Sequence, residues 1–214
     1  MEHSFWHERW EANQLGFHRD SANPLLVDHL ADLALGPGAR VFLPLCGKTL
    51  DIGWLMEQGH AVAGAELSEI AIRDLFSDLG ITPEVNTVGP IARWTAPGID
   101  VFVGDIFDLT AEILGPVDAV YDRAALVALP PEMRTRYTAH LRALTQHAPQ
   151  LLITFAYDQS VMDGPPFSVV PEEVRKHYEA AFDIAELSTR PIEGGLKGFC
   201  PADATAWHLR KLTR

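Results

Sequence analysis

Two stretches of sequence decide the fold: Arg40-Val-Phe-Leu-Pro-Leu-Cys-Gly-Lys48 and, after a helical segment, Ala61-Val-Ala-Gly-Ala-Glu-Leu-Ser68. Each begins as an apolar run. The first run opens onto a tight turn at Gly47, and the second ends in the carboxylate of Glu66. This pattern is typical of a parallel strand–helix–strand unit that binds a nucleoside cofactor. In such units the backbone of the first turn approaches the ligand, and an acid at the tip of the second strand accepts hydrogen bonds from the ribose hydroxyls.

The alternation of apolar strands and amphipathic helices continues along the chain and predicts a mostly parallel sheet covered by helices on both faces. The last two strands have only a short connection, so we expect them to pair antiparallel. The pattern predicts strands at 41–45, 61–66, 99–104, 117–121, 150–157, 182–187 and 204–211, and helices at 4–14, 24–35, 50–58, 69–79 and 131–144. These make about seven strands in one α/β domain spanning residues 1–214.

Composition excludes several classes of protein. The chain has 17 basic and 29 acidic residues, and a net charge of -12 repels nucleic acids and anionic lipids. No apolar run approaches the ~20 residues of a membrane span, and the acidic N-terminal residues do not resemble a signal peptide. The two cysteines, Cys46 and Cys200, form no disulfide framework. We therefore expect a cytoplasmic protein, a monomer, with no nucleic-acid or membrane partner and no metal site.

Chemistry-bearing residues follow four consecutive predicted strands. Leu45 follows the first strand, Glu66 ends the second, Asp105 and Ile106 follow the third, and Asp122-Arg123 follows the fourth. The carboxyl ends of parallel strands meet at one edge of a sheet, where α/β proteins bind their ligands. Glu66 has two oxygens that suit a ribose diol, although a solvated acid capping the next helix is the alternative interpretation.

The first loop indicates which cofactor this edge binds. A dinucleotide needs Gly-x-Gly-x-x-Gly to crowd backbone amides around its pyrophosphate, but the loop contains a single glycine and a proline. A phosphate-binding Walker A loop is excluded as well, because Phe42 stands where its first glycine belongs. A cofactor without phosphates fits better, which favours S-adenosylmethionine over a nicotinamide dinucleotide.

Five motifs occur in a fixed order: Val41-Phe-Leu-Pro-Leu-Cys-Gly-Lys48, Gly64-Ala-Glu-Leu-Ser-Glu69, Gly104-Asp-Ile-Phe-Asp108, Tyr121-Asp-Arg-Ala-Ala-Leu-Val-Ala-Leu-Pro130, and Tyr157-Asp-Gln with Gly164-Pro-Pro-Phe-Ser-Val169. Together with Trp6, Trp10 and Phe17-His18 they resemble the thiopurine S-methyltransferase family, particularly its bacterial members, from about residue 4 to residue 170. The resemblance implies the class I methyltransferase fold, a Rossmann-like three-layer sandwich whose last strand is antiparallel. It also implies S-adenosyl-L-methionine as the methyl donor and S-adenosyl-L-homocysteine as the product.

The resemblance also assigns roles to individual residues. It places residues 1–36 in an N-terminal helical lid, with Trp6 and Phe17 beside the acceptor. The family has a second arginine in the loop before the last strand, where this chain offers only Arg190 or Lys197 nearby. The cofactor contacts that it implies are Trp10, Leu45, Glu66 and Arg123, with Ile106 at the adenine edge. We expect Asp105, which follows the same strand, to be a further cofactor contact.

The chemistry of the residues agrees with such an enzyme. An aromatic thiol is acidic enough to be partly ionised at neutral pH, so methyl transfer from a sulfonium to its sulfur needs positioning and exclusion of water rather than a strong base. Aromatic rings such as Trp10 hold a flat heterocycle and face a sulfonium cation. Selenium or tellurium compounds, small aliphatic thiols and halides are alternative acceptors. A non-catalytic module that binds S-adenosylmethionine is the alternative of another class.

Three further elements have two interpretations each. Arg123 either acts on the thiolate and the cofactor or only pairs with Asp122. Asp158 either contacts the acceptor and relays a proton or caps a turn. Pro165-Pro166-Phe167 either forms a stiff wall over the acceptor pocket or is an ordinary turn.

Overall fold

Nine strands form one mixed sheet in the order β3-β4-β5-β2-β1-β6-β7-β9-β8 in the computed structural model, which describes residues 6, 8–10 and 21–212. The five central strands β5, β2, β1, β6 and β7 are parallel, and the pairs β7–β9 and β8–β9 are antiparallel. The strands are β1 (Arg40–Pro44), β2 (Ala61–Glu66), β3 (Glu84–Val88), β4 (Ile91–Ala96), β5 (Ile99–Val103), β6 (Ala119–Arg123), β7 (Gln150–Ala156), β8 (Phe182–Pro191) and β9 (Asp203–Lys211).

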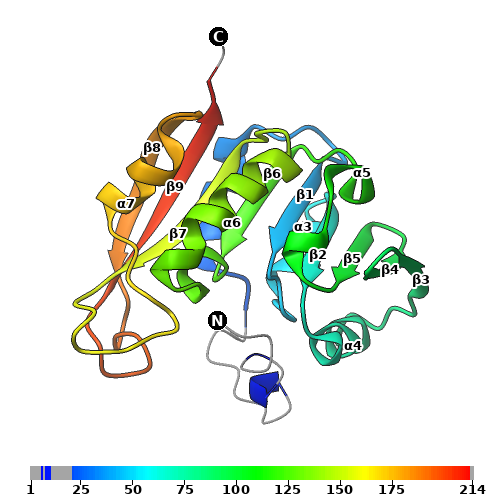
Figure 1. The fold of residues 1–214 in the computed structure, drawn as a ribbon, viewed down its shortest axis with the longest axis horizontal. Helices are drawn as coiled ribbons and strands as arrows, with labels where there is room; N and C mark the ends of the chain where they lie inside the picture. The colour runs from blue at the N-terminus through cyan, green and yellow to red at the C-terminus, as the bar shows by residue number, and fades with distance from the viewer. Residues whose placement is uncertain (1–5, 7, 11–20, 213–214) are drawn as a thin grey trace.

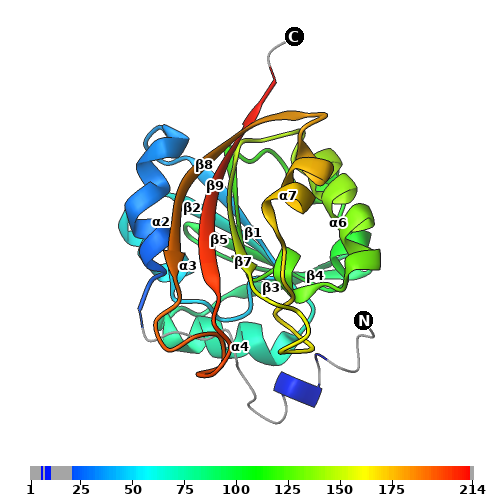
Figure 2. The ribbon, with the colours of Figure 1, turned by 90° about the vertical axis from the view of Figure 1, so that its left-hand side faces the viewer.

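Helices cover both faces of this sheet, which gives the expected three layers (Figure 2). One face carries α2, α3 and α4, and the other carries α6 and α7. The helices are α2 (Pro24–His29), α3 (Asp51–Glu57), α4 (Glu69–Asp78), α5 (Ala111–Leu114), α6 (Pro131–Leu144) and α7 (Pro171–Tyr178), with 3-10 turns η1 (Leu30–Leu33), η2 (Ile106–Asp108) and η3 (Leu126–Ala128).

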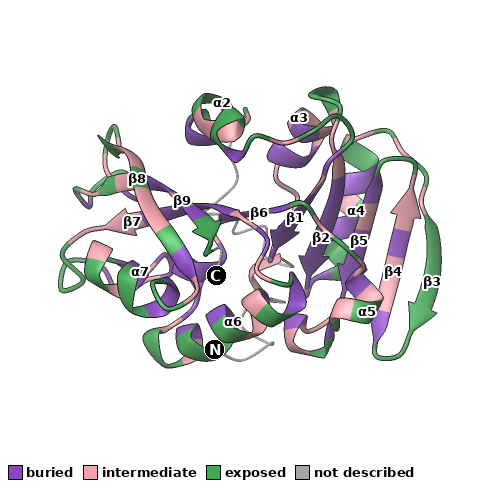
Figure 3. Cartoon of the chain, turned by 90° about the horizontal axis from the view of Figure 1, so that it is seen from above, coloured by how far each residue is buried: buried purple, intermediate pink, exposed green. Residues whose placement is uncertain are grey.

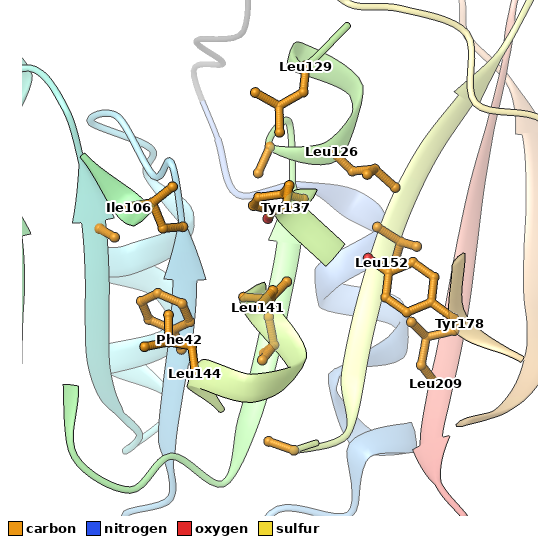
Figure 4. Packing of buried hydrophobic residues seen from close by; sticks show 14 of the residues in the cluster. Phe42, Ile106, Leu126, Leu129, Tyr137, Leu141, Leu144, Leu152, Tyr178 and Leu209 are labelled. Atoms are coloured by element: carbon orange, nitrogen blue, oxygen red, sulfur yellow. The ribbon is translucent and has the colours of Figure 1, made fainter. Parts of the chain in front are cut away.

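The central strands are buried from both sides, as Figure 3 shows by colour. In β1 alternate residues point to opposite faces: Val41 packs with α2, α3 and α4, while Phe42 belongs to the cluster under α6 and α7. Figure 4 shows the cluster that contains Phe42, in which Leu141 of α6 and Tyr178 of α7 pack onto the sheet. The near-continuous apolar strands of the sequence therefore correspond to a sheet with two hydrophobic cores.

The prediction of about seven strands was too low, because a hairpin of β3 and β4 extends the sheet beyond β5. Every residue of β3 is exposed, and in β4 only Ile91 and Trp94 are buried. An edge strand packs against little, so its sequence lacks the apolar run that marked the central strands. The helix α7 was not predicted either, and the predicted helix at 24–35 ends as an α-helix at His29 and continues as η1.

The N-terminal helix expected at 4–14 is described only in part. Residues 6 and 8–10 are helical, and they lie beyond the carboxyl ends of the parallel strands, toward the bottom of Figure 1. Within the described ranges, no helix has the length and apolar character needed to cross a bilayer.

Candidate active site

A cavity of about 130 Å³ lies at the carboxyl ends of β1, β2 and β6, beneath the described N-terminal helical residues. Its walls come from five separate segments of the chain, as expected for a ligand site at this edge of an α/β sheet. It is lined by Trp6, Arg9, Trp10, Leu43, Pro44, Leu45, Cys46, Gly47, Lys48, Thr49, Asp51, Glu66, Leu67, Tyr121, Arg123, Ala124, Ala128 and Leu129.

The Glu66 carboxylate joins the two stretches that define the first strand–helix–strand unit. Its Oε2 accepts a hydrogen bond from the Gly47 amide at 2.9 Å, and its Oε1 accepts one from the Ser68 amide at 2.9 Å. Burial raises the pKa of Glu66, while the backbone amides of Ser68, Gly47 and Leu67 oppose that rise. A carboxylate offers about four acceptor sites, so three backbone amides leave capacity for one further hydrogen bond from a ligand hydroxyl. Ser68, rather than Glu66, caps α4 with its hydroxyl.

The turn after β1 is shaped to bring a flat surface against the backbone. Gly47 has φ +54°, and a Cβ atom at this position would lie 3.2 Å from Cζ2 of Trp10. The indole of Trp10 therefore lies directly over this glycine. Leu45 (φ 50°) and Ala124 (φ 65°) also adopt left-handed conformations although neither is glycine, and both line the cavity. Backbone strain of this kind gathers at ligand sites.

Arg123 ends β6 and lines the cavity with a buried Nε atom that has no hydrogen-bond partner within the described residues. The neighbouring Asp122 lies on the opposite face of the strand, where it accepts hydrogen bonds from the Tyr137 hydroxyl at 2.7 Å and the Leu126 amide at 3.1 Å. Burial raises the pKa of Asp122 to about 6. The structure therefore does not contain the ion pair between Arg123 and Asp122 that was the alternative interpretation of Arg123.

The residues directly after β5, Asp105 and Ile106, do not line the cavity. Ile106 is buried in the core, and its carbonyl oxygen lies 2.7 Å from Nε2 of His140 on α6. The Asp105 carboxylate accepts a hydrogen bond from the Phe107 amide at 2.9 Å, which caps η2. These two residues, predicted as cofactor contacts, thus form a fixed turn at the end of β5.

The predicted acceptor residues lie in part elsewhere. Asp158 is exposed, and its carboxylate accepts hydrogen bonds from the Ser160 amide and hydroxyl at 3.0 and 2.7 Å, which lower its pKa. The Pro166 carbonyl accepts a hydrogen bond from the Tyr157 hydroxyl at 2.6 Å. The Phe167 amide donates to Val127 of η3 at 2.6 Å, so this loop backs the turn that carries the cavity residues Ala128 and Leu129. Phe17 lies outside the described residues.

Several cavity residues were not predicted from the sequence. Lys48 forms an ion pair with Asp74 of α4 at 3.0 Å, and the buried pair Asp51 and Tyr121 is joined by a hydrogen bond of 3.0 Å. Arg9 also lines the cavity, one residue before Trp10. The signal for Asp51 was its position at the start of the helix that follows the first turn. The signal for Tyr121 was its spacing of two from Arg123, which places both on one face of β6.

Neither candidate for a second cation in the loop before β9 reaches the cavity. Arg190 forms an ion pair with Asp28 of α2 at 2.7 Å, and Lys197 lies in an exposed turn. Neither belongs to the cavity lining. Among the residues whose positions are given, no group of three or more His, Cys, Asp or Glu side chains is arranged to hold a metal ion.

The cavity offers a set of groups that suits an adenosine-linked amino acid. It combines a buried carboxylate with spare acceptor capacity at Glu66, a buried guanidinium atom at Arg123 and an aromatic ring at Trp10. These complement a ribose diol, a carboxylate and a sulfonium cation, respectively.

The sequence matches known proteins over most of its length. The family model described as thiopurine S-methyltransferase matches residues 1–197, which extends past the last motif found in the sequence. The chain is 58% identical to the thiopurine S-methyltransferase of Xanthobacter autotrophicus over 99% of this chain and 100% of that protein. It is 50% identical to the enzyme of the same name from Gluconobacter oxydans, over 97% and 94%.

Two solved structures of methyltransferases have a similar fold. The 1,6-didemethyltoxoflavin-N1-methyltransferase of Burkholderia thailandensis, with bound S-adenosylhomocysteine, has a TM-score of 0.66 at 16% identity and covers 98% of this chain and 87% of its own. Magnesium protoporphyrin IX methyltransferase of Synechocystis PCC 6803, with bound S-adenosylhomocysteine, has a TM-score of 0.64 at 15% identity, over 98% and 100%. At these identities the likeness establishes the fold alone.

Proposed function

Because the chain belongs to the thiopurine S-methyltransferase family and is an S-adenosylmethionine-dependent methyltransferase, we propose that it methylates the sulfur of aromatic or heterocyclic thiols. The observation that carries this proposal is the cavity at the ends of β1, β2 and β6. Its lining includes the Glu66 carboxylate and the indole rings of Trp6 and Trp10.

The proposed cofactor contacts follow from the geometry of the cavity. Glu66 accepts a hydrogen bond from a ribose hydroxyl with the acceptor capacity that the backbone amides leave free. Trp10 packs against the cofactor from the side of Gly47, and Leu45 supports it from the end of β1. Ile106, with Asp105, borders the adenine. When bound, S-adenosylmethionine supplies an electrophilic methyl group on a cationic sulfur.

Arg123 is the cation that we propose to act on both ligands. Its guanidinium, whose Nε atom is buried, contacts the cofactor and stabilises the thiolate that approaches the methyl group. In the reaction the thiolate sulfur forms a bond to the methyl carbon as the bond to the sulfonium sulfur breaks, so no proton has to move in that step. The contribution of the protein is to align the two sulfur atoms and exclude water.

The acceptor side of the site is proposed from Trp6, Phe17, Pro166 and Phe167, with Asp158 as the group that contacts the acceptor or relays its proton. The hydrogen bond from the Phe167 backbone amide to the Val127 carbonyl supports this placement, because it links the Pro166-Phe167 loop to the turn that carries two cavity residues. The turn-capping bonds of Asp158 to Ser160 favour the structural role for that residue.

Selenium and tellurium compounds form the second candidate class of acceptor. Any polarizable chalcogen anion fits the same in-line displacement, and the indole rings of Trp6 and Trp10 suit a soft nucleophile as well as a flat one. Small aliphatic thiols and halides satisfy the same geometry but make less use of the aromatic walls. We place the protein in the cytoplasm as a monomer.

The test of catalysis is equilibrium dialysis with radiolabelled donor, with and without 6-mercaptopurine. The proposal predicts donor binding in both samples and methylated thiol only in the second. Donor binding without any methylated product would favour a non-catalytic binding module.

A further inference from the structure

We propose that Asp51 binds the ammonium group of the cofactor's amino-acid tail. The inference rests on the proposed cofactor site and extends it from the ribose to the tail. That tail is a zwitterion, so a site that recognises it needs an anion as well as a cation. Among the cavity-lining side chains that the structure describes, only Glu66 and Asp51 are carboxylates.

The position of Asp51 separates it from the ribose end of the site. Glu66 ends β2, and Tyr121, which donates to Asp51, lies on β6; β1 runs between these strands. With strands about 4.8 Å apart, the backbones of β2 and β6 are separated by about 10 Å. The adenine is proposed beside Ile106, at the end of β5 on the far side of β2. The tail must then extend in the other direction, over β1 toward β6.

The Asp51 carboxylate is held in one orientation by groups from two other parts of the chain. Its Oδ2 accepts from the Tyr121 hydroxyl at 3.0 Å, and its Oδ1 accepts from the Asn23 amide at 2.7 Å. Only 2% of Asp51 is exposed, yet the residue lines the cavity. Each oxygen accepts one further hydrogen bond, so the carboxylate has two sites left for an ammonium donor.

The charges around the tail complete the match. Arg9, Lys48 and Arg123 line the same cavity and supply positive charge for the tail carboxylate. Lys48 already forms an ion pair with Asp74 of α4 at 3.0 Å, whereas the Nε atom of Arg123 has no hydrogen-bond partner within the described ranges. The cavity therefore offers an anion and a cation on the β6 side, which is the complement of an amino acid.

The test compares three ligands by isothermal titration calorimetry: S-adenosylhomocysteine, its analogue without the amino group, and 5′-methylthioadenosine, which lacks the whole tail. For Asp51→Asn we expect a loss of affinity for S-adenosylhomocysteine of roughly 10- to 100-fold, the range of a charge-assisted hydrogen bond. Affinity for the other two ligands should change less than about threefold. Asparagine keeps the shape of the side chain and one oxygen that accepts a hydrogen bond from the Asn23 backbone amide or the Tyr121 hydroxyl.

Asp122→Asn is the matched control, because Asp122 is an equally buried carboxylate whose side chain bonds Tyr137 on the opposite face of β6. It should leave the ratio of the three affinities unchanged. An equal loss for all three ligands in Asp51→Asn would mean that Asp51 only holds the loop, and no change would mean that it does not touch the tail. Either result overturns the proposal.

The wild-type protein supplies a test that needs no variant to fold. It should bind S-adenosylhomocysteine at least about tenfold more tightly than the analogue without the amino group. Equal affinities would show that no ammonium site exists and would overturn the proposal while leaving the cofactor site intact. Failure of the wild type to bind S-adenosylhomocysteine at all would instead contradict the proposed function itself.

Discussion

The Gly47 amide donates a hydrogen bond of 2.9 Å to the Glu66 carboxylate, across 19 positions of sequence. This bond fastens the turn after β1 to the tip of β2, the two strands at the centre of the parallel sheet. The same glycine supports the Trp10 ring on its open side. One short turn thus contacts both the proposed ribose acceptor and the Trp10 ring, and changes to either contact should affect donor binding.

Replacing Glu66 by Gln should weaken donor binding by about 1–2 kcal/mol, the cost of a charge-assisted hydrogen bond to the ribose. Glutamine keeps an acceptor oxygen for only one of the Gly47 and Ser68 amides and places its NH2 group against the other, whereas the carboxylate accepts from both. Calorimetric titration with S-adenosylhomocysteine measures the effect. A dissociation constant equal to that of the wild type would remove Glu66 from the cofactor site.

Replacing Gly47 by Ala should weaken donor binding beyond what backbone strain explains. The left-handed conformation (φ +54°) costs about 1 kcal/mol for any residue with a Cβ, and the new methyl group would press on the Trp10 ring at 3.2 Å. Gly80→Ala is the control, because Gly80 has φ +66° but nothing within 4 Å of the added Cβ. Both variants should lose similar stability in thermal unfolding, and only Gly47→Ala should lose donor affinity. Equal donor affinity in the two variants would show that Trp10 does not form the wall of the site.

Replacing Arg123 by Ala should lower turnover more than it lowers donor affinity, because the cation acts on the approaching thiolate as well as on the cofactor. Steady-state kinetics with a saturating aromatic thiol gives kcat, and calorimetry gives the donor Kd. Arg123→Lys keeps the charge without the planar guanidinium, so its turnover should lie between those of the wild type and Arg123→Ala. If Kd and kcat change by the same factor in Arg123→Ala, the residue only positions the cofactor.

Asp122 should make the protein less stable as the pH rises through its titration range. Its pKa is about 6 in the folded protein against 3.8 for an ordinary aspartate, so the folded state binds more protons between these values. Stability then falls with rising pH across that window, by an amount on the order of 3 kcal/mol. Urea unfolding of the wild type and of Asp122→Asn from pH 4 to pH 7 measures it. The stability of the wild type relative to the variant should decrease between pH 4 and 6, and a constant difference would contradict the burial argument.

The sequence predicted the centre of the fold because the central strands carry continuous apolar runs, such as Val41–Leu43 and Ala61–Ala65. The β3–β4 hairpin was missed for the opposite reason: an edge strand such as Glu84–Val88 buries nothing and has no comparable signal. Strand count at the edges of a sheet therefore depends on packing that the pattern does not express.

Some residues of the candidate site could likewise be predicted from the sequence, and others could not. Leu45, Glu66 and Arg123, which the sequence predicted as cofactor contacts, line the cavity, and their positions at strand ends can be predicted from the sequence. Asp51 and Tyr121 were missed because their role depends on a hydrogen bond between positions 70 residues apart. The position of the Pro166-Phe167 loop against η3 could not be predicted from its motif, because it depends on a backbone hydrogen bond from Phe167 to Val127.

The most direct test of the central claim is the production of S-adenosylhomocysteine by the purified protein with a panel of acceptors. The panel contains 6-mercaptopurine, thiophenol, selenite, tellurite and iodide. We expect product with the two aromatic thiols, because the cavity at the ends of β1, β2 and β6, which is lined by two indole rings, suits a flat, soft nucleophile. Product with selenite or tellurite alone, or no product with any acceptor although the donor binds, would contradict thiol methylation as the function of this site.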